Sequence, residues 1–179
     1  MSNISRSVLF GKLNTTLYKT LENAYTFCRL RENSYVELVH WLHSLLQTEK
    51  TDIFCLINHF NLDEAKVRKD VLAAIEKLPV GATAVIDFSE HIQTLVEQTW
   101  TYSSLKFGTD KIRTAHIFYT ILQNKTLQGI LANISSEFLK IKPETLANNI
   151  IAITANSEEN LDVTQNALSS EPNATHKES

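Results

Sequence analysis

Apolar residues recur at helical spacing in two stretches of the chain, and the stretches match each other at an offset of about 75 residues. The matching pairs in the first helix of each copy are Leu13 and Phe88, Leu17 and Ile92, Leu21 and Val96, Phe27 and Tyr102, and Leu30 and Leu105. A one-residue adjustment then aligns Val36, His40, Trp41, Leu45 and Leu46 with Ile112, His116, Ile117, Ile121 and Leu122. One copy alone buries little apolar surface, whereas two packed copies share a core. The repeat therefore predicts an all-α domain with internal pseudo-twofold symmetry.

Each copy is predicted to contain four helices. The first copy has them over residues 14–30, 36–47, 52–60 and 64–77, and the second over residues 89–106, 113–123, 126–133 and 143–153. Asn14 and Ser89 occupy equivalent positions at the start of the first helix, where a side-chain oxygen accepts a hydrogen bond from an unpaired backbone N–H. The chain has only four Gly and three Pro, which favours long helices over strands and turns.

The repeats divide the chain into five segments. Residues 1–12 are expected to form an extra N-terminal helical segment, 13–78 the first four-helix repeat, 79–87 a connector broken by Pro and Gly, 88–155 the second repeat, and 156–179 a disordered linker. Helical periodicity fades after residue 155 into a stretch rich in Asn, Ser, Glu and Thr, which is typical of linkers.

The charge distribution argues against nucleic acid and membrane as partners. The net charge is −3, but residues 156–179 carry five acids and one base, so residues 1–155 are close to neutral. Phosphate binding needs a concentrated basic surface, which a near-neutral body lacks. No apolar run approaches the length of about 20 residues that spans a bilayer, and the first residues lack the pattern of a signal peptide. We expect a cytoplasmic protein.

The histidines form no recognisable metal or catalytic motif. His40, His43 and Glu37 are close in sequence, so a metal site is conceivable, but no HExxH pattern or Cys/His set supports it. His40 and His116 occupy the same position in the two repeats. A residue that recurs with the repeat is expected to serve packing or a hydrogen bond at a helix end.

Other catalytic machinery is also missing from the sequence. Cys28 and Cys55 lie inside helical patterns without CxxC spacing, and we expect buried, reduced thiols. The four glycines are isolated and form neither GxxxxGK nor GxGxxG, the loops that bind phosphates. The chain is therefore predicted not to be an enzyme, and to hold no metal or cofactor.

What remains is apolar surface. The two pseudo-symmetric halves leave a seam, and neither repeat explains the segment Val8-Leu9-Phe10. An amphipathic helix from another protein could bind in such a groove. These residues could equally well only cover the core, and the pattern does not decide between the two interpretations.

Several blocks of sequence resemble a known family. The opening of the first repeat, LNTTLYKTLENAYTFCRLRENSYVELVHWLHSLL, resembles the N-domain of Clp-type AAA+ unfoldases, members of the Hsp100 chaperones. The blocks LFGKLN (9–14), YVELVHWLHSLL (35–46), DFSEHIQTLVEQTW (87–100) and LKFGTDKIRTAHI (105–117) are similar to the ClpV (TssH) subgroup of bacterial type VI secretion systems. The resemblance covers roughly residues 5–155.

The resemblance implies a partner and a mechanism. ClpV N-domains capture a helix near the amino terminus of the large sheath protein (VipB/TssC), so that the ATPase ring can disassemble and recycle the contracted sheath. The parent protein is then a cytoplasmic AAA+ ATPase and a homohexamer, whereas the isolated domain is expected to be a monomer. ATP and magnesium are expected only in ATPase modules, whose motifs this sequence lacks.

The resemblance also implies a binding site beside the N-terminal segment and the first helix. Carried onto this chain, the peptide-binding residues are expected to be Leu9, Phe10, Leu13, Thr16, Leu17, Thr20, Ile86 and Phe88. Thr16 and Thr20 are small and four residues apart, which would let a partner helix approach closely. A charged residue at Leu17 or Phe88 is expected to abolish peptide binding and leave helicity intact.

Three alternatives remain open at this point. The first is a generic Clp/Hsp100 N-domain that docks adaptors or unfolded substrates. The second is a small enzyme or ligand-binding helical protein, and the third is a structural spacer that binds no peptide.

Overall fold

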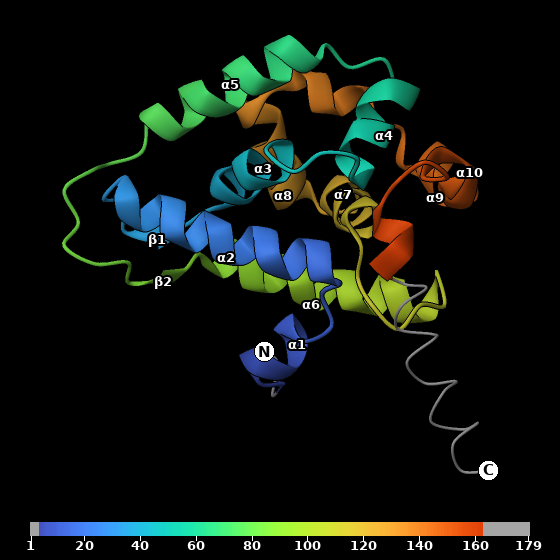
Figure 1. Ribbon diagram of the computed structural model, residues 1–179, viewed down its shortest axis with the longest axis horizontal. Coiled ribbons are helices and arrows are strands. Elements are labelled where there is room, and N and C mark those ends of the chain that lie inside the picture. The colour runs from blue at the N-terminus through green and yellow to red at the C-terminus, as the bar shows by residue number, and fades with distance from the viewer. Residues whose placement is uncertain (1–3, 163–179) are drawn as a thin grey trace.

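The computed structural model describes residues 4–162, and this part of the chain is built from helices with two short strand contacts (Figure 1). The first repeat comprises α2 (Thr15–Leu30), β1 (Tyr35–Val36), α3 (Leu38–Leu46), α4 (Asp52–His59) and α5 (Glu64–Glu76), preceded by α1 (Arg6–Phe10). The second repeat comprises β2 (Asp87–Phe88), α6 (Glu90–Leu105), α7 (Thr114–Gln123), α8 (Lys125–Ile134), the 3₁₀ helix η1 (Ser136–Lys140), α9 (Pro143–Asn148) and α10 (Ile150–Ile153). The all-α double repeat with an extra N-terminal helix is confirmed.

The second repeat departs from its predicted pattern after α8. The helix expected over residues 143–153 is interrupted at Asn149, whose φ of −131° and ψ of 24° lie outside the helical region, so that α9 and α10 are separate. Residues 136–140 form η1 where no helix was predicted. Val36 was placed in a helix but lies in β1, because a strand contact between the repeats occupies it.

The two repeats exchange short strand contacts. In β1 and β2, which pair in parallel, Tyr35 lies opposite Asp87 and Val36 opposite Phe88. The symmetry-related contact is a parallel bridge between Leu13 and Ile112. In each contact, residues before the second main helix of one repeat pair with residues before the first helix of the other. The two backbone contacts are thus related by the pseudo-twofold symmetry that the sequence repeat predicts.

His40 and His116 perform the same structural task in the two repeats. Nδ1 of His40 accepts a hydrogen bond from the backbone N–H of Glu37 at 2.8 Å, and Nδ1 of His116 accepts one from the N–H of Arg113 at 3.2 Å. Glu37 and Arg113 are the N-cap residues of α3 and α7. Nε2 of His40 also contacts the amide oxygen of Asn33 at 2.9 Å. The predicted helix-end role of this histidine pair is confirmed, and a metal role for His40 is not supported because both ring nitrogens are engaged.

The core lies between the helices of both repeats. The helix α2 packs on α3, α6 packs on α7, and α4 of the first repeat contacts α7 of the second. Trp41 is fully buried, and its indole N–H donates to the hydroxyl of Thr20 at 3.0 Å. Asn14 and Ser89 cap α2 and α6 as predicted, each accepting from a backbone N–H of its own helix.

The segment that follows the second repeat does not behave as the predicted linker from residue 156. Residues 159–162 are helical and pack on the body, and Glu159 is fully buried. Its carboxylate accepts from the side-chain amide of Asn14 and the N–H of Thr114, both at 3.0 Å, and from the N–H of Asp52 at 2.8 Å. The prediction of a disordered linker was wrong for residues 156–162. The polar composition of this stretch gives no sign that Glu159 is buried and hydrogen-bonded to the body. Residues 163–179 lie outside the described part of the chain.

Acidification is expected to destabilise the domain through the paired histidines. Burial lowers the pKa of both His40 and His116 to about 4, whereas an unfolded chain titrates near 6.5. Between these values the unfolded state binds more protons, so their stabilisation is complete above pH 6.5 and is lost as pH falls toward 4. Each histidine contributes at most about 3 kcal/mol. Urea unfolding at pH 7.5 and pH 5 measures the difference, and a His40→Gln variant with an unchanged pH dependence would contradict this assignment.

Glu159→Ala is expected to reduce the free energy of unfolding by roughly 2–4 kcal/mol. The change leaves the backbone N–H groups of Asp52 and Thr114 without their buried acceptor. Glu158→Ala is the matched control, because Glu158 is the adjacent acid and is exposed. Equal denaturant midpoints for the two variants would show that the anchor does not hold the segment.

Candidate functional site

Most of the side chains predicted to bind a peptide face the interior. Leu9, Leu13, Leu17 and Thr20 are buried, and Leu17 has no exposed surface at all. These four residues offer little surface to a partner, and none of them lines the groove described below, so their role in binding stays a prediction. The reason for the burial is geometric: the apolar stripe of α2, which is the strongest signal in the sequence, is the face that packs on α3.

Thr16 and Thr20, the two threonines of the predicted site, are hydrogen-bonded within the domain. The Thr20 hydroxyl donates to the carbonyl oxygen of Thr16 at 2.8 Å and accepts from Trp41. The backbone N–H and hydroxyl of Thr16 both donate to the carboxylate of Asp162, at 3.2 and 3.0 Å. Thr16 and Thr20 therefore do not offer a smooth face for a partner helix.

Phe10, Ile86 and Phe88 do reach one side of the molecule. Phe10 is almost fully buried and meets the half-buried Phe88 edge-to-face, with ring centroids 5.3 Å apart. Tyr25 from α2 also contacts Phe88, with ring centroids 6.0 Å apart. Ile86 precedes β2 and is 66% exposed. The three elements α1, α2 and β2 thus bring aromatic rings together at one surface.

A groove of about 350 Å³ runs along this surface, which we call the α2 groove. It is lined by Phe10, Tyr18, Leu21, Glu22, Tyr25, Thr26 and Phe88. Tyr18 and Tyr25 are 46% and 37% exposed and lie seven residues apart, so they occupy the same face of α2 two turns apart. Glu22 lies between them and supplies the carboxylate of the lining. The groove can accept an apolar helical face, with a basic residue placed near Glu22.

The two tyrosines were missed by the sequence reasoning. They do not fall on the repeated apolar stripe, and their counterparts in the second repeat are Gln93 and Trp100. A signal was nevertheless present: two tyrosines at helical spacing on the polar face of α2 have no role in the core. A comparison of the positions at which the two repeats differ identifies both tyrosines.

The N-terminal helix α1 forms one wall of the α2 groove and is held by Arg6. Its guanidinium donates to both carboxylate oxygens of Asp87, at 2.6 and 3.2 Å, and to the side-chain oxygen of Gln93 at 3.1 Å. The hydrogen bond from Arg6 keeps the pKa of Asp87 below its usual value. Arg6 also lies 5.8 Å from the ring centre of Phe88. The wall is therefore tied to the element that carries the central aromatic ring.

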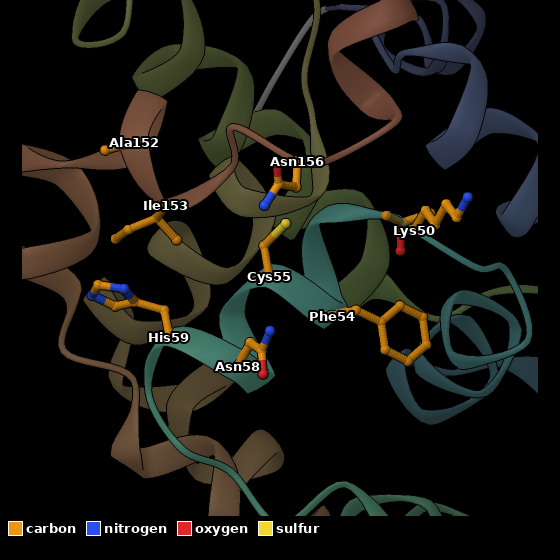
Figure 2. Close-up of a pocket in the computed structure, with 9 residues that line it drawn as sticks. Lys50, Phe54, Cys55, Asn58, His59, Ala152, Ile153 and Asn156 are labelled. Carbon is orange, nitrogen blue, oxygen red and sulfur yellow. The ribbon is translucent and has the colours of Figure 1, made fainter.

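A separate pocket of about 410 Å³ lies between α4 and α10 (Figure 2). In Figure 2 the sulfur of Cys55 points toward Asn156. His59, one turn after Cys55 on α4, lies below Ile153 of α10 in this view. Burial raises the pKa of the Cys55 thiol, which favours the unreactive protonated form. The lining mixes polar and apolar groups without an aromatic patch, so it resembles the α2 groove in neither composition nor shape.

Neither a cluster of metal-ligating side chains nor a membrane-spanning helix is found among residues 4–162. Within residues 4–162, no three His, Cys, Asp or Glu side chains are grouped so that they could hold a metal ion. His43 stacks on Phe27, with ring centroids 4.2 Å apart. None of the helices in this range is both long and apolar enough to cross a bilayer.

Comparison with known proteins matches residues 12–134 to the family of the Clp repeat (R) N-terminal domain. The AAA+ ATPase ClpV1 of Pseudomonas aeruginosa is 42% identical over 160 residues, which cover 89% of this chain and 18% of that relative's length. A structure solved in work on the coevolution of the ATPase ClpV, the TssB–TssC sheath and the accessory HsiE protein is 42% identical, with a TM-score of 0.86. The match covers 89% of this chain and 98% of that one.

A complex of a ClpV N-domain with a VipB peptide has the same fold. Its TM-score is 0.75 at 24% identity, and the match covers 89% of this chain and 97% of that chain.

Substitutions on the two faces of α2 are expected to differ strongly in their effect on stability. Leu17→Asp places a charge in the fully buried core and should prevent folding, in contrast to the expectation from sequence. Tyr18→Ala removes a half-exposed ring and should change the free energy of unfolding by less than about 1 kcal/mol. Circular dichroism during urea unfolding measures both. A folded, stable Leu17→Asp protein would contradict this placement of α2.

Proposed function

The chain belongs to the Clp repeat N-terminal domain family, and from this premise we propose that it binds a helix of the large type VI sheath protein (VipB/TssC) in the α2 groove. The observation that carries the proposal is the cluster of aromatic rings that lines the α2 groove. Phe10, Tyr25 and Phe88 meet there, and Tyr18 extends the cluster along α2.

The shape and chemistry of the groove favour a helix as its ligand. Tyr18 and Tyr25 are two helical turns apart, about 10 Å, which matches the spacing of apolar side chains at positions i, i+3 or i+4, and i+7 of a bound helix. Aromatic rings give large contact area at small cost in conformational entropy. Glu22, between the tyrosines, favours a ligand with a basic residue at the middle of its contact face.

Similarity to relatives supports the proposed identity of the partner. A related N-domain has been solved with a VipB peptide, and a structure 42% identical to this chain comes from work on the coevolution of ClpV with the TssB–TssC sheath. The chain spans 18% of the length of its ClpV1 relative, so activity of the whole protein is part of the proposal. In this proposal a cytoplasmic AAA+ ring, a homohexamer, disassembles the contracted sheath after the N-domain has captured it. ATP and magnesium act in that ring, and the N-domain binds protein without a cofactor.

Alanine substitution of Tyr25 is expected to weaken binding of the sheath-protein helix about 10- to 30-fold. Tyr25 contacts Phe88, the central ring of the aromatic cluster, and it lines the α2 groove with 37% of its surface exposed, which a bound helix would cover. The measurement is isothermal titration calorimetry with a synthetic peptide covering the amino-terminal segment of the cognate sheath protein. Leu72→Ala is the control, because Leu72 is a similarly exposed apolar residue on α5. Equal affinities for the two variants would place the binding site elsewhere.

A generic Clp/Hsp100 N-domain that docks adaptors or unfolded chains is the second candidate function. The same titration with a proline-broken version of the peptide separates the two. A sheath-helix site loses affinity for the broken peptide, whereas a site for unfolded chains retains it. Deletion of residues 1–11 gives a second criterion, because it removes the α1 wall and should weaken binding only in the sheath-helix case.

A further inference from the structure

The pseudo-twofold axis creates two equivalent junctions between the repeats. The first junction lies at the N-termini of α2 and α7, where Leu13 bridges to Ile112, and its N-cap residues are Asn14 and Arg113. The second junction lies at the N-termini of α6 and α3, where Phe88 pairs with Val36, and its N-cap residues are Ser89 and Glu37. Corresponding positions in the two junctions can therefore be compared directly.

The first junction is filled by an acidic stretch of the chain itself, residues 157–162. Glu159 accepts hydrogen bonds from Asn14 and from the N–H of Thr114, the first residue of α7. Asp162 accepts two hydrogen bonds from Thr16. The base at this junction is Arg113, whose guanidinium lies on Asp52 with contacts of 2.7 and 2.8 Å. A short segment that turns into a helix at Glu159 thus docks at the first junction through its carboxylates.

The second junction is an open pocket of about 540 Å³, which we call the α3/α6 pocket. Its lining is made up of Arg6, Tyr35, Glu37, Asp87, Phe88, Ser89, Glu90, His91 and Gln93. The repeat alignment places Ser89 opposite Asn14, His91 opposite Thr16, and Glu37 opposite Arg113. The pocket therefore occupies the position that residues 157–162 fill at the first junction.

The sign of the charge is reversed between the two junctions. Glu37 stands where the first junction has Arg113, and Glu90 adds a second, exposed carboxylate. Within residues 4–162 neither glutamate takes part in an ion pair, whereas Arg6 is already paired with Asp87. Charge complementarity at this pocket therefore favours an occupant with a positive charge over the carboxylates used at the first junction.

The α3/α6 pocket adjoins the α2 groove, because Phe88 lines both. A short stretch that flanks a helix in the groove is therefore within reach of the pocket. Tyr35 is 44% exposed and forms part of the pocket, where its ring can receive the stem and charge of a basic side chain.

We propose that the α3/α6 pocket binds a lysine or arginine side chain from the stretch that directly flanks the helix held in the α2 groove. This inference rests on the proposed function, and it extends the partner's footprint from a helix to a helix with a basic flank. The pocket fixes the register of the bound helix, because the flank reaches Glu37 and Glu90 only when the helix is correctly placed in the groove.

The test is a titration with the sheath-protein helix extended by five residues, Gly-Ser-X-Ser-Gly, at either its amino or its carboxyl end. With X as Lys, one of the two extensions should bind about threefold to fivefold more tightly than the same peptide with X as Gln, and X as Glu should bind more weakly than Gln. The gain should disappear at high salt, because the pocket is open to solvent.

The double variant Glu37→Gln/Glu90→Gln should bind the Gln peptide normally and lose the preference for Lys. Glu144→Gln is the control, because it removes one exposed carboxylate on α9, away from the pocket. Equal affinities for Lys, Gln and Glu at both ends would overturn the inference and leave the groove intact. Failure of every peptide to bind would overturn the groove itself. If the double variant instead changed the sedimentation of the protein alone, a second copy of the chain would be the occupant, and the proposal would be wrong.

Discussion

The reciprocal strand contacts between the repeats determine the rest of this structure. In each repeat, the residues before the second main helix pair with the residues before the first helix of the other repeat. Val36 pairs in this way with Phe88, and Ile112 with Leu13. Backbone hydrogen bonds of this kind fix both distance and direction. They set the start of α2, α3, α6 and α7 relative to one another. The cores of both repeats then merge into one, since α4 of the first repeat packs on α7 of the second.

Polar groups at the helix ends complete these junctions. His40 and His116 bond back to the N-cap residues of their own helices and remain neutral because they are buried. Glu159 is also buried, and burial together with the carboxylate of Asp52 raises its pKa to about 7. The N–H donors that converge on Glu159 belong to helix starts or their caps, where a carboxylate interacts favourably with the helix dipole. A residue distant in sequence therefore closes one junction.

The proposed binding surface lies where the symmetry of the two repeats is broken. The repeats share their buried stripe, but Tyr18 and Tyr25 on α2 have no aromatic pair of the same arrangement on α6, where Gln93 and Trp100 stand. The helix α1 has no counterpart before α6, and Arg6 fastens it to Asp87 beside Phe88. These additions to one side of a symmetric body create the α2 groove, while the acidic segment fills the opposite junction. In the proposed function, the symmetric frame holds the groove in place and the asymmetric additions supply its specificity.

The sequence by itself determined the helical double repeat, the N-caps Asn14 and Ser89, and the structural role of the histidine pair, because helical periodicity and capping are local properties. Resemblance identified the kind of partner and directed attention to Phe10 and Phe88. Only the tertiary structure decided which side of α2 is exposed: Leu17 lies in the core and Tyr25 in the groove. An apolar stripe is compatible with a core and with a binding surface, and which of the two it forms depends on what packs against it. Glu159 shows the same limit, since its role as a buried anchor depends on donors more than 40 residues away in the chain.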